Sequence, residues 1–109
     1  MLRTSNLGNL LPNADDRVAV IYTTGCPACI NMFRTIGARM PQPERGQTVI
    51  PPMTLRSSPN VVFVHFDSLQ DRRNVPHVPF IIRYIGDQEP EVVQEGVPFL
   101  LHYMQQRIQ

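Results

Sequence analysis

Residues 18–29 read VAVIYTTGCPAC, a stretch in which an apolar run leads directly into the only two cysteines of the chain. The slightly longer segment 17–23, RVAVIYT, is rich in β-branched and aromatic residues, which predicts a buried β-strand. Cys26 and Cys29 follow this strand and are separated by a proline and an alanine. Such a pair can be a redox couple, half of a metal site or two incidental thiols.

An amphipathic helix is predicted directly after the strand. Pro27 suits its first turn, where a missing N–H costs nothing. Apolar residues then recur with helical spacing, at Cys29, Phe33, Ile36 and Met40. Pro41 and Pro43 are expected to stop the helix.

The next segments alternate between irregular and strand-like sequence. Residues 41–59 contain five prolines and one glycine, so we expect a long proline-rich loop without regular elements. Residues 60–67, NVVFVHFD, predict a second buried strand, parallel to the first because a helix and a crossover separate them. Residues 68–74 could form two helical turns, with Asp67 or Ser68 as the cap.

The C-terminal third predicts a hairpin and a helix. Strands are expected at 80–85 and 91–94, joined by a turn at Gly86 and Asp87. A final helix is predicted by the apolar residues of 97–108, at Val97, Leu100, Leu101, Met104 and Ile108. We therefore expect one α/β domain over 1–109, with a mixed sheet of about four strands flanked by helices and an irregular lead-in over 1–16.

The position of the cysteines at a helix start has chemical consequences. If Cys26 is the N-cap, its sulfur faces the unpaired N–H groups of Ala28 and Cys29 and the positive end of the helix dipole. Both favour thiolate and lower the thiol pKa, so Cys26 would be the attacking sulfur. Cys29, on the apolar stripe, would be less exposed and would resolve the mixed disulfide.

VAVIYTTGCPAC together with HVPFIIRYIGDQEPEVVQEG, residues 77–96, resembles the thioredoxin and glutaredoxin superfamily. The family pattern is a strand, Cys-x-x-Cys opening a helix, and a β-hairpin preceded by a cis-proline, which Pro79 matches here. The resemblance implies a thioredoxin-like fold and a thiol–disulfide oxidoreductase without a cofactor, acting on disulfides of proteins or small thiols. The family's buried acidic residue would fall near Val20, and its tryptophans and glutathione-binding segment have no counterpart.

The resemblance also suggests which residues surround the reacting sulfur. Pro79, if cis, would expose the backbone of Val78 for pairing with an extended substrate chain. Tyr22 could line the site or be a core aromatic, and Pro27 is expected beside the substrate. His77 could assist proton transfer or be a solvent-facing loop residue.

Two other interpretations stay open. A zinc site would need two further ligands from His65, His77 and His102, but these lack the spacing of zinc-binding motifs. Alternatively, the chain could be a non-catalytic thioredoxin-like module with inert thiols, built into a larger assembly such as a virus particle. Residues 41–59 would then act as an extended docking arm.

Composition excludes several function classes. The formal net charge is +1, with basic and acidic residues interspersed, so we expect no nucleic-acid partner. All ten basic residues are arginines, which excludes lysine nucleophiles and Schiff bases. No apolar run approaches the length of a membrane span, and the first residues lack the apolar core of a secretory signal. We therefore expect a soluble, cytoplasmic protein.

Overall fold

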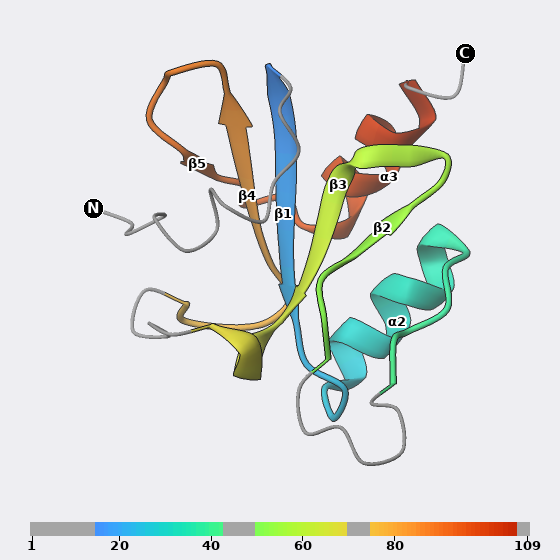
Figure 1. The fold of residues 1–109 in the computed structure, drawn as a ribbon. Helices are drawn as coiled ribbons and strands as arrows, with labels where there is room; N and C mark the ends of the chain where they lie inside the picture. Colours follow the sequence, from blue (N-terminus) through green and yellow to red (C-terminus); the bar gives the residue numbers. More distant parts are fainter. Residues whose placement is uncertain (1–14, 43–49, 70–74, 107–109) are drawn as a thin grey trace.

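The computed structural model describes residues 15–42, 50–69 and 75–106. These residues form an α/β unit with a five-stranded mixed sheet and two α-helices (Figure 1). The strands are β1 (Asp16–Tyr22), β2 (Met53–Leu55), β3 (Ser58–His65), β4 (Phe80–Ile85) and β5 (Glu91–Val92). The helices are α2 (Pro27–Ile36), α3 (Val97–Gln106) and the short 3₁₀ helix η1 (Phe66–Ser68).

The first strand lies at the centre of the sheet, whose order is β2-β3-β1-β4-β5 (Figure 1). It runs parallel to β3, as the sequence predicts, and antiparallel to β4. Because β1 has a neighbour on both sides and packing on both faces, it must be apolar throughout. Residues 18–22 are accordingly completely buried.

The two faces of the sheet form separate cores. Alternate side chains of β1, at Val18, Val20 and Tyr22, pack with residues of α2 and α3. Ala19 and Ile21 point to the other face, where residues of β3, β4 and the segments after them surround them. This alternation follows from the two-residue period of a strand, and it places both helices on one face of the sheet.

The helix α2 ends at Gly37 rather than at Pro41. Gly37 adopts a left-handed conformation with φ of 76°, and its N–H donates to the Arg34 carbonyl. The Ala38 N–H reaches back to the Phe33 carbonyl at 3.0 Å, which completes a Schellman motif. The prediction that the helix continues through Met40 is therefore wrong. Met40 nevertheless packs against the core. An apolar residue was therefore found at the next helical position of the sequence, although the helix has already ended.

The prediction of a structureless loop over 41–59 is also wrong. β2 pairs antiparallel with β3 and adds an edge strand, so the sheet has five strands instead of about four. The pairing shifts register between Thr54 and Leu55, and Pro59 falls in the part of β3 opposite this irregularity. Proline is tolerated there because no ladder hydrogen bond requires its N–H. Residues 43–49 lie outside the described residues.

Other predicted boundaries move by one to three residues. β1 starts at Asp16, inside the predicted lead-in, and β3 covers 58–65 instead of 60–67. β4 is confirmed at 80–85, and β5 ends at Val92. At the predicted start of a helix over 68–74, a 3₁₀ turn covers Phe66–Ser68 and is capped by the His65 side chain, and Leu69 is extended. Residues 1–14, 70–74 and 107–109 lie outside the described residues.

An ion pair fixes the start of β1 to the neighbouring strand and helix. The Arg83 guanidinium on β4 donates to both carboxylate oxygens of Asp16, at 3.1 and 2.8 Å. The Tyr103 hydroxyl of α3 donates to the Asp16 carbonyl at 3.3 Å, and its ring lies beneath Arg83. This bidentate geometry is the stronger kind of ion pair. It ties α3 to the end of the sheet that is remote from the cysteines.

We expect Gly37→Ala to lower the free energy of unfolding by about 1 kcal/mol, because only the left-handed backbone conformation opposes a side chain there. No atom lies within 4 Å of the Cβ that the substitution would add. Gly25→Ala is the matched control, since Gly25 also has open space but no positive φ. Urea denaturation of both variants measures the difference. Equal losses would contradict a conformational cause.

Candidate functional site

Cys26 occupies the N-cap of α2, as the sequence predicts. Its backbone is extended, with φ of −97° and ψ of 118°, and its Sγ accepts a hydrogen bond from the Cys29 N–H at 3.3 Å. The Ile30 N–H donates to the Cys26 carbonyl at 3.0 Å and closes the first helical turn. The sulfur thus takes the place of the oxygen that Ser, Thr or Asp supplies at most helix starts.

The surroundings of Cys26 favour its thiolate. Partial burial alone would raise the pKa of the Cys26 thiol. Hydrogen bonds from the Cys29 thiol and from the backbone N–H groups of Cys29 and Ala28 outweigh that burial, so the pKa of Cys26 lies below its usual value. The two backbone N–H groups have no partner within the helix, and a negatively charged sulfur is a stronger acceptor for them than a neutral one. Cys26 is only half-buried, so the reactive form is accessible.

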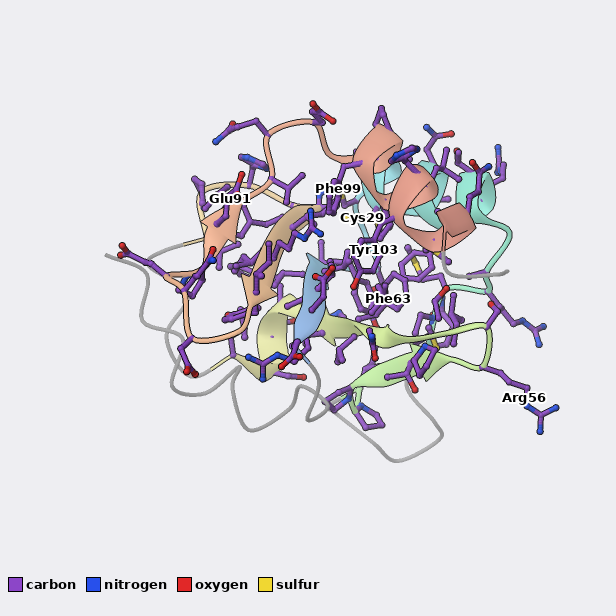
Figure 2. All side chains as sticks on the ribbon, turned by 90° about the horizontal axis from the view of Figure 1, so that it is seen from above. Cys29, Arg56, Phe63, Glu91, Phe99 and Tyr103 are labelled. Atoms are coloured by element: carbon purple, nitrogen blue, oxygen red, sulfur yellow. The ribbon has the colours of Figure 1, made fainter. Side chains whose placement is uncertain are left out.

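Cys29 has the opposite environment. It is completely buried in the core beneath α2, with Phe63 and Tyr103 in the same cluster (Figure 2). Burial raises the pKa of the Cys29 thiol to about 12, against the opposing effect of the Thr23 backbone N–H. Donation to Cys26 and the charge of Cys26 raise it further. The two cysteines approach to 3.2 Å, and both are free thiols. The site therefore pairs an accessible thiol whose pKa is lowered with a buried thiol whose pKa is raised.

The segment before β4 lies against Cys26. The Val78–Pro79 peptide bond is cis, and the Cys26 thiol donates to the Val78 carbonyl at 3.6 Å. Val78 is partly buried and packs against both cores, so its carbonyl is held in place beside the sulfur. The structure thus brings together four of the predicted site residues, namely Cys26, Cys29, Val78 and Pro79.

The outer rim beside Cys26 is apolar. Pro27 stands in the first turn of α2 and is exposed, and Ala28 beside it is exposed as well. Ile30 exposes 43% of its surface, although it is a large apolar side chain. Sequence reasoning missed Ile30, and the available signal was an isoleucine off the apolar stripe of the helix. An exposed apolar side chain next to a reactive group is suited to contact a partner.

Tyr22 lies in the core instead of facing the site. Its side chain is completely buried, and its ring meets Phe33 and His65 edge to face at 5.1 and 5.4 Å. Burial raises the pKa of Tyr22 to about 12. Of the two roles open to Tyr22 from the sequence, the core aromatic fits this placement.

The histidines do not converge on the cysteines. His77 is exposed and its ring packs against Phe80 at 5.5 Å, which fits a solvent-facing loop residue. His65 is buried and its Nδ1 accepts from the Asp67 N–H, whereas His102 is exposed on α3. In the part of the chain that the structure describes, no three His, Cys, Asp or Glu side chains gather as a metal site would require.

Comparison with known proteins adds no relative: no family model, no curated protein and no solved structure matches this chain. Among the described residues, neither helix combines the length and apolarity needed to cross a membrane.

We expect alkylation with iodoacetamide to label Cys26 first. Because the pKa of Cys26 is lowered, its labelling rate should reach half of its plateau at a pH below that of an ordinary cysteine, and Cys29 should stay unlabelled until the protein unfolds. Mass spectrometry of labelled protein across a pH series measures both sites. Cys26→Ser is the control, because it leaves only the buried thiol. If iodoacetamide labelled Cys29 quickly in the folded Cys26→Ser variant, the Cys29 thiol could not be buried.

Proposed function

We propose that the protein is a thioredoxin-like thiol–disulfide oxidoreductase that exchanges its Cys26/Cys29 dithiol with disulfides. The observation that carries this proposal is the pairing of a helix-capping, half-exposed Cys26 of lowered pKa with a buried Cys29 one turn behind it. Inert structural thiols need neither the capping geometry nor the difference in pKa.

In the reducing direction, the Cys26 thiolate attacks one sulfur of a substrate disulfide. A Cys26–substrate disulfide forms, the substrate's own S–S bond breaks, and the released thiolate takes a proton from solvent. Cys29 then loses its proton and attacks the Cys26 sulfur. The Cys26–Cys29 disulfide forms and the second substrate thiolate leaves, so the substrate gains two electrons and the protein loses two. A dithiol reductant returns the protein to the starting state, and the same steps in reverse oxidise a substrate dithiol.

The geometry favours a polypeptide disulfide over a small anionic thiol. The exposed residues that follow Cys26 in α2, Pro27, Ala28 and Ile30, are uncharged, and the Val78 carbonyl lies beside its sulfur. In a protein substrate, the side chains on either side of the disulfide cysteine can pack against these apolar residues, whereas a small thiol offers fewer such contacts. The Val78 segment could pair with an extended chain through its backbone.

The order of elements supports the thioredoxin-like part of the proposal. β1 leads into the cysteines at the start of α2, a parallel β3 follows, and a proline precedes the β4–β5 hairpin and α3. This is the order expected from the resemblance.

Substitution of each cysteine separates their roles. Cys26→Ser should abolish turnover of a disulfide-containing protein in the presence of a dithiol reductant, because no accessible thiolate remains. Cys29→Ser should keep the first step but accumulate the Cys26–substrate mixed disulfide, visible on a non-reducing gel. Thr35→Ala, at an exposed position near the far end of α2, is the control and should retain full activity.

Wild-type turnover by Cys26→Ser would overturn the mechanism. Absence of both turnover and mixed disulfide in all variants would favour the non-catalytic adaptor instead.

A further inference from the structure

The two edges of the sheet carry opposite charges. At the β5 edge, the β4–β5 hairpin exposes Asp87, Glu89 and Glu91. At the β2 edge, Arg56 is exposed in the turn between β2 and β3. Glu91 and Arg56 project from opposite sides of the molecule (Figure 2). Two copies of the chain therefore present complementary surfaces when the β5 edge of one faces the β2 edge of the other.

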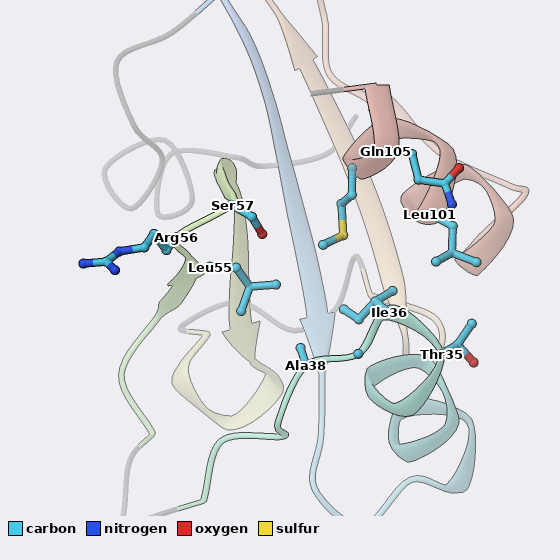
Figure 3. Close-up of a pocket in the computed structure, with 10 residues that line it drawn as sticks. Thr35, Ile36, Ala38, Leu55, Arg56, Ser57, Leu101 and Gln105 are labelled. Carbon is cyan, nitrogen blue, oxygen red and sulfur yellow. The ribbon is translucent and has the colours of Figure 1, made fainter. Parts of the chain in front are cut away.

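A hollow lies at the basic edge. It has a volume of about 580 Å³ and is enclosed by the end of α2, the β2–β3 turn and α3. Figure 3 shows Ile36 and Leu55 reaching toward each other across it, while Arg56 points outward at its rim. Much of the remaining wall is apolar as well, being formed by Ala38, Leu101 and Met104.

Arg56 is the one charged residue among the described residues that line this hollow. None of the described residues that line it is acidic. Two further exposed arginines, Arg34 and Arg39, stand next in sequence to lining residues. An apolar floor with a cationic rim is complementary to an apolar side chain flanked by carboxylates.

The opposite edge presents that combination. Ile85 ends β4 with 36% of its surface exposed, one of two large apolar side chains that are exposed among the described residues. Asp87 and Glu89 follow it in the turn and are both exposed. Glu91 lies across from Arg83 in the β4–β5 register and raises the pKa of that arginine, although Asp16 contributes more. Asp87 and Glu89 are thus the carboxylates best placed to reach a partner.

We propose that this protein associates head to tail, with the Ile85 turn of one copy seated in the hollow between α2, β2 and α3 of the next. Ile85 enters the apolar floor, and Asp87 and Glu89 face the arginine rim. The two surfaces differ and lie on opposite edges. A copy that uses its Ile85 turn in one contact therefore still has its hollow free for another copy, so the contact repeats into a ring or an open chain.

The cysteines are not part of this contact. The hollow is at the C-terminal end of α2, whereas Cys26 caps its N-terminus, about 15 Å away along a helix of ten residues. The association is therefore independent of the proposed oxidoreductase function.

Sedimentation velocity of the full chain, from micromolar protein up to about 1 mM, tests the association, since so small a contact is expected to be weak. We expect the weight-average mass to rise with concentration. We also expect raising NaCl from about 50 mM to about 500 mM to reduce it, because the rim charges are exposed. A monomer at every concentration, or an association that salt leaves unchanged, would overturn the proposal.

Charge exchange tests the pairing. Arg56→Glu and Asp87→Arg should each weaken association about tenfold, because each replaces an attraction by a repulsion. The double variant Arg56→Glu/Asp87→Arg should regain most of the loss, since the pair is restored with its signs reversed. Ile85→Ser should weaken association at all salt concentrations, through the apolar contact alone.

Gly25→Glu is the control, because it adds a negative charge in the exposed turn before α2, at the opposite end of that helix from the hollow, and should leave the association unchanged. Circular dichroism checks that each variant is folded. If the folded single variants associate like the wild type, or if the double variant shows no recovery, the two edges do not meet. The Cys26→Ser variant should associate like the wild type even though it cannot exchange disulfides. The association can therefore be tested separately from the proposed oxidoreductase function.

Discussion

One hydrogen bond, from the Cys29 N–H to the Cys26 sulfur, links the fold of this protein to its chemistry. A helix start leaves backbone N–H groups without partners, and a side chain at the N-cap must accept from them. Here that acceptor is a thiol, which becomes a better acceptor when it loses its proton. The local requirement of the helix and the stabilisation of the thiolate are therefore the same interaction.

The rest of the sheet holds that interaction in place. β1 is buried on both faces and bonded on both sides, so its end is a rigid base for the turn that carries Cys26. α2 packs on one face, which buries Cys29 and separates the two thiols in pKa. Because Val78 packs against both cores, the backbone opposite the sulfur is equally constrained.

The molecule also separates two kinds of surface. Cys26, with the exposed and uncharged Pro27 and Ala28 after it, lies at the N-terminal end of α2, whereas the charged groups of the proposed contact lie at the sheet edges. If copies of the chain associate through these edges, the Cys26 sulfur of each copy stays accessible to solvent. The proposed exchange at Cys26 and the proposed association through the edges would therefore not exclude each other.

Local sequence was sufficient for the features that depend on neighbouring residues. The apolar run before Cys26 predicted β1, the short spacing and Pro27 predicted the helix start, and Gly86 predicted the hairpin turn, because strand burial, capping and turn formation are local requirements. Tertiary structure decided the remainder. β2 forms only because β3 offers a free edge, so a proline-rich segment could not reveal it. Tyr22 faces the core and His77 faces solvent because of packing between distant segments, and the same packing brings Val78 to the sulfur of Cys26.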